Sequence, residues 1–433
     1  MTEIRLQKPN GLFSMKEPQA KIEIMAPAGS FEALTAAIKA GANSVYFGIE
    51  QLNMRAKAAN NFTLEDLVDI VVTCKKAGVK TYLALNTVMY THDITLMQKI
   101  CNTAKKAGLT AVIASDLAAI TYAKKIGLEV HISTQQNVTN YETVEFFSTY
   151  ADVVVLAREV TLKQVREIHD KIVSNDLRGP KGELIQIELF AHGALCVAIS
   201  GKCYMSLATY NSSANRGACR QNCRRSYKVI DEETGVELVV DNKYIMSPKD
   251  LCTIGFVDQI LEAGVSVLKL EGRGRSADYV RTVTKCYREA VDSYYEGTYT
   301  KEKIDAWITE LETVYNRGFW HGGYYLGKQM GEWSGVYGSQ ATKENIFVGR
   351  VSHYFSKTNI AEITIETGNM QKGQDVLFTG PTTGALTVNN VTPWVDGKAV
   401  DIAKKRDVCS MIVSERVRDN DRVFLVVPRQ HVQ

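Results

Sequence analysis

The sequence lacks the features of a membrane protein or a secreted protein. No run of about 18 apolar residues occurs along the chain, so we expect no membrane span. Residues 1–21 are polar and basic without an apolar centre, so they do not resemble a signal peptide, and we expect a cytoplasmic location. Neither sign of charge dominates, because 51 lysines and arginines accompany 48 acidic residues. The net charge of +3 therefore neither requires nor excludes a nucleic-acid partner.

Common catalytic motifs are absent as well. The chain contains no HExxH helix and no GxSxG elbow, which argues against a zinc or serine peptidase. No glycine-rich dinucleotide fingerprint follows the first predicted strand, which runs instead into Pro-Ala-Gly-Ser at residues 27–30.

Cysteine is scarce but clustered. Only nine cysteines occur in 433 residues, and four of them lie in one arginine-rich stretch: Cys196, Cys203, Cys219 and Cys223. In a reduced compartment such thiols are expected to be metal ligands rather than disulfide partners. Four thiolates hold either zinc or an iron–sulfur cluster. Only Cys219 and Cys223 form a short pair, which favours a cluster and leaves zinc open.

Cys252 is a fifth candidate ligand, with a small buried apolar residue as the favoured alternative. The other cysteines are expected to be structural, and they are Cys74, Cys101, Cys286 and Cys409.

Arginines surround the last two clustered cysteines. Arg216, Arg220, Arg224 and Arg225 would offset the negative charge of a thiolate cluster and could also bind an RNA backbone. The alternative is a solvated basic face.

A repeated pattern predicts the fold. Predicted helices end in an Ala-Gly or Ile-Gly pair. A short apolar run follows, of the kind that is buried on both faces of a parallel sheet. Eight strands are expected, at residues 22–26, 44–48, 80–86, 110–115, 128–134, 152–157, 185–190 and 266–272. Eight such units predict a TIM-like (β/α)₈ barrel over residues 21–298, with a doubly wound open sheet as the alternative.

Three further segments accompany the barrel. The cysteines lie in an insertion at residues 191–263, which is too long for an ordinary loop. Residues 1–20 are expected to form an N-terminal arm, and residues 299–342 a helical connector. Residues 343–433 contain short strands with polar turns, which predict a small β-rich, barrel-like C-terminal domain.

Candidate reactive residues follow from the rule that barrel sites form at the C-terminal ends of the strands. Arg158 and Arg273 can grip an anionic substrate bidentately, although each could instead belong to an ion pair at the barrel rim. Polar residues at other strand ends add Asn86 and Gln135 to the substrate-binding candidates.

Three further residues are candidates for catalysis. Glu188 interrupts an apolar strand and needs a partner there, so it is a candidate acid or base, as is Glu271 at another strand end. His192 could carry protons, donate a hydrogen bond to a cluster, or simply be a satisfied loop histidine.

The stretch from Glu188 to Ser206, ELFAHGALCVAISGKCYMS, resembles the signature of the peptidase U32 family. Other segments of the chain also resemble the family, including LAREV at 156–160, RGACRQNCR at 216–224 and KLEGR at 269–273. Within that family the chain is most similar in motif to the tRNA hydroxylation protein P branch.

The resemblance implies an oxygen-independent RNA hydroxylase that carries a [4Fe–4S] cluster on Cys196, Cys203, Cys219 and Cys223. In the branch it resembles, prephenate, a dicarboxylate, serves as co-substrate and 5-hydroxyuridine forms at the tRNA wobble position. The implied partners are tRNA or rRNA, with a paralogous subunit as a further candidate. Hydroxylation of a 23S rRNA cytidine, a U32-type collagenase, and an RNA-binding protein with structural zinc are the alternatives.

Overall fold

The computed structural model describes residues 22–57, 61–225, 227, 229–238, 247–327, 332–335 and 338–430. The expected N-terminal arm at 1–20 lies outside these residues.

Eight parallel strands form a closed ring at the centre of the first two-thirds of the chain. They are β1 (Glu23–Pro27), β2 (Ser44–Phe47), β3 (Lys80–Leu85), β4 (Ala111–Ala114), β5 (Glu129–Ile132), β6 (Val153–Val155), β7 (Gln186–Gly193) and β11 (Val267–Leu270). Each strand pairs with the next, and β11 pairs in parallel with both β7 and β1, which closes the ring. The predicted barrel is therefore confirmed, and the open sheet is wrong.

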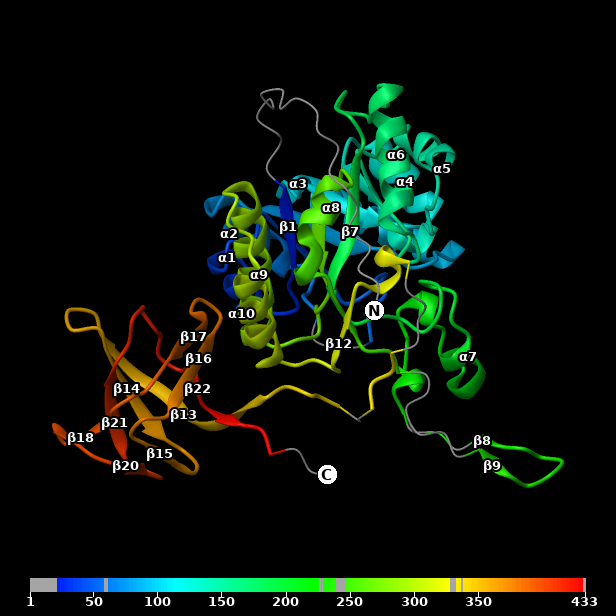
Figure 1. Ribbon diagram of the computed structural model, residues 1–433. Helices are drawn as coiled ribbons and strands as arrows, with labels where there is room; N and C mark the ends of the chain where they lie inside the picture. The colour runs from blue at the N-terminus through cyan, green and yellow to red at the C-terminus, as the bar shows by residue number, and fades with distance from the viewer. Residues whose placement is uncertain are drawn as a thin grey trace.

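A helix follows every strand of the ring (Figure 1). The helices are α1 (Phe31–Lys39), α2 (Asp66–Lys76), α3 (Ile94–Ala107), α4 (Leu117–Lys125), α5 (Tyr141–Ser148), α6 (Leu162–Ser174), α8 (Val257–Glu262) and α9 (Ala277–Tyr295). Gly108 ends α3 with a φ of 81°, a conformation that suits glycine because it has no Cβ. Among the described residues, no helix is long and apolar enough to cross a membrane.

The strands are buried on both faces, as their continuous apolar runs predict. Residues such as Ile24, Val45 and Leu189 face the helices and belong to the main core. A second apolar cluster packs separately from it and consists of Met25, Tyr46, Tyr82, Ala111, Ile113, Val153 and Val267.

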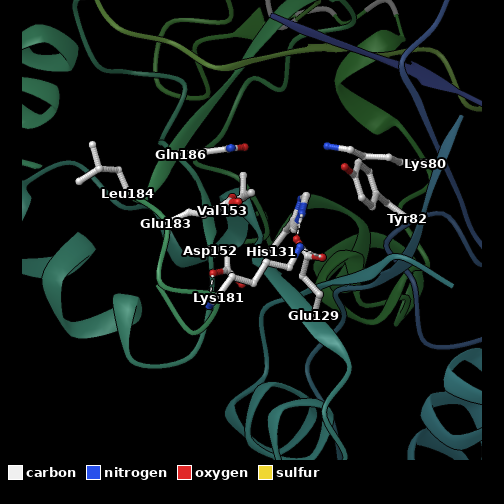
Figure 2. Close-up of a pocket in the computed structure, with 10 residues that line it drawn as sticks. All are labelled: Lys80, Tyr82, Glu129, His131, Asp152, Val153, Lys181, Glu183, Leu184 and Gln186. Carbon is white, nitrogen blue, oxygen red and sulfur yellow. Dashed lines mark hydrogen bonds and ion pairs between the residues drawn. The ribbon is translucent and has the colours of Figure 1, made fainter. Parts of the chain in front are cut away.

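A buried network of charged residues accompanies this second cluster. Glu188 on β7 forms an ion pair with Lys269 on β11 at 2.6 Å, and its other oxygen lies 3.5 Å from the ring of His131. Next to His131 is a small cavity of about 50 Å³ (Figure 2). Because Lys80, Glu129 and Gln186 line it and are the first residues of their strands, the cavity lies at the N-terminal end of the barrel. It is thus at the end opposite to the predicted site.

The long segment between β7 and α8 carries the clustered cysteines. It contains α7 (Met205–Tyr210), the 3₁₀ turns η3 (Ala214–Arg216) and η4 (Asn222–Arg224), β8 (Val229–Ile230), β9 (Glu237–Leu238) and β10 (Asp250–Cys252). Strand β10 pairs antiparallel with the end of β7, and β12 (Phe319–His321) pairs with β10. This extension of the barrel sheet was not predicted from the sequence.

The connector region 299–342 contains α10 (Lys301–Glu312), strand β12 and the 3₁₀ turn η6 (Gly323–Leu326). An antiparallel sheet follows in the order β17-β16-β22-β13-β14-β21-β18-β19. Its strands are β13 (Lys343–Phe355), β14 (Ile360–Ile365), β16 (Asp375–Gly380), β17 (Gly384–Val388), β18 (Trp394–Val395), β19 (Lys398–Ala399), β21 (Val408–Ile412) and β22 (Arg422–Pro428). Strands β15 (Asn369–Gln371) and β20 (Ile402–Lys404) form a separate pair.

The C-terminal sheet packs against α1 and α9 of the barrel (Figure 1). Leu377 and Ala385 are buried together with Ala36 and Ala277. An ion pair of 2.9 Å between Lys39 and Glu415 joins the two parts at their surface.

Candidate functional site

Glu271 follows β11 at the C-terminal end of the barrel and lies among arginines. Its carboxylate accepts a hydrogen bond of 2.9 Å from the Tyr46 hydroxyl and forms an ion pair of 2.5 Å with Arg55. Burial would raise the pKa of Glu271, but Arg55, Arg158, Tyr46 and Arg273 together lower that pKa to about 2. Glu271 is therefore a permanent carboxylate near neutral pH, suited to positioning cations rather than to donating a proton.

Arg273 is fixed beneath the loop that follows β2. It is only 5% exposed, and it donates a hydrogen bond of 2.5 Å to the side-chain oxygen of Asn53. A Cβ on Gly48 would lie 2.6 Å from its Nη1, so the glycine makes room for the guanidinium. Burial lowers the pKa of Arg273 to about 10, at which it is still a cation near neutral pH.

Arg158 approaches the same group from the end of β6. Its guanidinium stacks on the ring of Phe190 at 3.9 Å, and its Nη1 donates to the carbonyl of Ala194 at 2.9 Å. Its Nε is buried without a hydrogen-bond partner, while the side chain as a whole is half-buried. Arg55, Arg158 and Arg273 thus place three positive charges around one carboxylate, and the site has the excess charge needed for an anion.

Asn86 and Gln135 lie together beside these groups. The Asn86 amide donates to the Gln135 side chain at 3.2 Å and accepts a hydrogen bond from the backbone of Met54 at 3.1 Å. Gly201 of the cysteine-bearing segment packs on Gln135, since a Cβ there would lie 3.1 Å from the Gln135 side chain. Both residues therefore connect the end of the barrel to the segment that carries the thiols.

The side chains of Glu188 and His192 have other partners than these arginines, although the His192 carbonyl accepts a hydrogen bond of 2.8 Å from the Glu271 N–H. Glu188 is fully buried in its pair with Lys269, an arrangement that gives it a structural role. His192 is surrounded by the rings of Tyr279, Tyr287 and Phe319. Burial lowers the pKa of His192 to about 3, so its imidazole stays neutral near pH 7.

The four clustered cysteines are free thiols and come close together in space. Charge on Cys196, Cys203 and Cys219 acts on the Cys223 thiol, whose pKa burial and these neighbours raise to about 11. The backbone N–H of Gln221 points at the Cys219 sulfur at 3.4 Å. Within the described part of the chain, no three His, Cys, Asp or Glu side chains are drawn tightly enough to hold a metal ion.

Thiols that gather without disulfides, with an N–H directed at a sulfur, provide the type of ligand that iron–sulfur clusters and zinc require. The residues are thus chemically suited to either group, although their sulfurs do not close around a centre. Cys252, by contrast, is fully buried in β10.

The four arginines of the cysteine segment divide into two kinds. Arg216 forms ion pairs with Asp93, the shorter at 2.5 Å, and Arg224 donates to the carbonyl oxygens of Leu195 and Pro248. These two arginines therefore hold the segment in place. Arg220 and Arg225 are exposed and remain available for contact with a polyanion.

Sequence reasoning missed Arg55, Tyr46 and Asn53. Arg55 and Asn53 lie in the loop after β2, at the barrel end where reactive groups are expected, but no motif or spacing distinguished them. Tyr46 lies within the strand predicted at residues 44–48, and an apolar run of this kind gives no sign of a functional hydroxyl. The position of their loop could have indicated Arg55 and Asn53, because it directly follows a strand of the barrel, where reactive groups are expected.

A closed (β/α)₈ barrel with a polar, arginine-rich group at the C-terminal ends of its strands is an architecture of barrel enzymes. Residues 29–335 match Peptidase family U32, and the chain belongs to that family.

Named relatives within the family fall into two kinds. A protein named collagenase from Porphyromonas gingivalis is 54% identical over 93% of this chain and 97% of its own length. The tRNA hydroxylation protein P1 of Bacillus subtilis is 32% identical over 89% of this chain and 90% of its own length. The 23S rRNA 5-hydroxycytidine C2501 synthase of Escherichia coli is 33% identical over 64% of this chain and 40% of its own length.

Proposed function

We propose that this protein is an RNA hydroxylase that depends on an iron–sulfur cluster and forms 5-hydroxyuridine at the tRNA wobble position with prephenate as co-substrate. The observation that carries the proposal is the proximity of two groups at one end of the barrel. Three arginines surround Glu271, and the loop that carries one of them, Arg55, contacts the cysteine segment, where the Lys57 N–H donates to the Gly217 carbonyl at 3.2 Å.

The arginine group supports an anionic co-substrate. Three guanidiniums against one carboxylate leave two positive charges, which match the two carboxylates of prephenate. The exposed Arg220 and Arg225 support a polyanionic second substrate.

The four free thiols are the proposed ligands of the cluster. When bound, a [4Fe–4S] cluster would supply one-electron redox chemistry. The residues of this chain would orient the co-substrate through Arg158, keep Glu271 charged and anchor the thiol-bearing segment through Arg216 and Arg224.

The test is a nucleoside profile. tRNA and rRNA from a deletion strain, and from that strain complemented with wild-type protein or C219A, would be digested and analysed by mass spectrometry. We expect 5-hydroxyuridine to disappear from the tRNA of the deletion strain and of the C219A strain, and to return with the wild type. Loss of 5-hydroxycytidine from 23S rRNA instead would transfer the proposal to that substrate.

The second candidate is a peptidase, favoured by the name of the 54% identical relative. It predicts that purified protein cleaves gelatin and that cleavage survives in C196A, because cluster ligands would not take part. Cleavage with an unchanged nucleoside profile would reject the hydroxylase proposal.

A further inference from the structure

The loop after β2 places Arg55 between the carboxylate of Glu271 and the cysteine segment. One end of the guanidinium forms the 2.5 Å ion pair with Glu271. The residues that follow it in the loop contact the cysteine segment: the Lys57 N–H donates to the Gly217 carbonyl at 3.2 Å, and a Cβ on Gly217 would lie 3.0 Å from the Ala56 Cβ. Arg55 therefore connects the two halves of the candidate site.

The backbone that carries Arg55 is fixed. The Asn53 side chain accepts a hydrogen bond from the Arg55 N–H at 3.0 Å, and the Asn61 amide donates to the Arg55 carbonyl at 3.1 Å. Leu52 adopts a φ of 56°, which a branched residue rarely does outside a tightly determined loop. The position of the Arg55 backbone is thus set, while its side chain stays 34% exposed.

Exposure distinguishes Arg55 from Arg273. Arg273 is 5% exposed, and it is held by Asn53 beneath Gly48. It has no free path to a ligand and acts as a positioning residue. Arg55 is accessible, and its partner Glu271 has a second anchor in the Tyr46 hydroxyl. Glu271 can therefore stay in place when Arg55 turns to another carboxylate.

We propose that Arg55 is an exchangeable latch: it rests on Glu271, and a dicarboxylate co-substrate takes it over and is held between Arg55 and Arg158 beside the cysteine segment. This inference rests on the proposed function, because it assumes an anionic co-substrate. The exchange replaces one carboxylate by another at the same guanidinium, and Glu271 keeps its hydrogen bond from Tyr46 and the positive field of Arg158 and Arg273. Arg158, whose side chain is half-buried at the same end of the barrel, supplies the second contact.

Binding of two probes to the anaerobically purified full-length protein tests the latch by isothermal titration calorimetry. Prephenate carries two carboxylates and phenylpyruvate carries one. We expect R55Q to weaken prephenate binding by about tenfold to a hundredfold, the range for a charge-assisted contact, and to change phenylpyruvate binding much less. R55K keeps the charge without the planar fork and is expected to give an intermediate loss.

E271Q provides a test of opposite sign. Removing the competing carboxylate frees Arg55, so prephenate is expected to bind about threefold more tightly or better. R178Q is the matched control, because Arg178 forms a comparable ion pair with Asp176 at 2.7 Å in the loop that leads into the N-terminal end of β7. Its affinity should equal that of the wild type.

Two results would overturn the latch while leaving the proposed function intact: prephenate binding in R55Q within about twofold of the wild type, or weaker binding in E271Q. Wild-type protein that binds no prephenate would overturn the latch and the choice of co-substrate together. The nucleoside profile tests the hydroxylase separately from both. Thermal melting of each variant establishes that it is folded before its affinity is read.

Discussion

Glu188 and Lys269 form an ion pair of 2.6 Å on two neighbouring strands of the barrel, with side chains no more than 6% exposed. A buried pair of this kind contributes little compared with a well-packed apolar pair, but removing one partner leaves an uncompensated charge. We therefore expect E188Q and K269M each to lower the free energy of unfolding by about 3–5 kcal/mol.

The double variant E188L/K269M should lose less than the sum of the two single changes, as measured by urea unfolding. K301Q, at the exposed pair Lys301–Asp305, is the control and should change stability by less than about 1 kcal/mol. Additive losses in the double variant would contradict the coupling.

His131 predicts a pH dependence of stability. Burial would lower its pKa, but Glu129 and Glu188, each 3.5 Å from the ring, raise that pKa above the ordinary 6.5. Because the folded state holds this proton more tightly, the contribution is complete below pH 6.5 and is lost as pH rises through the folded pKa.

The difference in unfolding free energy between wild type and H131Q should therefore be larger near about pH 6 than near about pH 9. H92Q, changed at a histidine whose side chain is 73% exposed, is the control. An equal difference at both pH values would show that the carboxylates do not hold a proton on His131.

The arginines of the cysteine segment should separate into binding and structural residues. We expect R220Q/R225Q to weaken tRNA binding and to reduce the slope of log affinity against log salt by about 1.4, if each contacts one phosphate of a single strand. R216Q and R224Q should instead lower the melting temperature, because they lose the contacts to Asp93, Leu195 and Pro248. A uniform effect of all four on affinity would contradict this division.

The metal assignment has a direct test. Anaerobically purified wild-type protein should be brown and contain about four irons per chain, as a cubane cluster requires. C219A should be colourless and depleted of iron. C252A should keep its colour and iron, because Cys252 is fully buried in β10. Protein rich in zinc and free of iron would favour the structural-zinc alternative.

The barrel could be predicted because each of its units repeats one local rule. A helix stop at glycine and a run of apolar residues follow from backbone sterics and burial, and both are visible within a few residues. The pairing of β10 with β7 could not be predicted, because it joins residues such as Leu251 and Gly193 across a long insertion.

Candidate site residues could be predicted where they follow the end of a strand. They could not be predicted where their role depends on side chains that are distant in the sequence. Glu271, Arg158 and Arg273 follow strands, and in the structure the charges of both arginines act on Glu271. The sequence contains no sign that Lys269 neutralises Glu188 or that aromatic rings enclose His192, because both facts depend on neighbours brought by the closed ring. Arg55 was not predicted as a site residue, because its role depends on its contact with Glu271, which is 216 positions away in the sequence.

The cysteine segment is fastened to loops on the far side of the ring. Gly217 packs so closely on the loop after β2 that a Cβ would lie 2.2 Å from the Asn53 carbonyl, and the backbone of Asn215 accepts a hydrogen bond of 3.1 Å from Val88. The positions of the sulfurs therefore depend on contacts with turns that lie more than a hundred positions earlier in the chain. A protein engineer who grafts residues 194–225 onto another barrel would need to transplant those two turns with them.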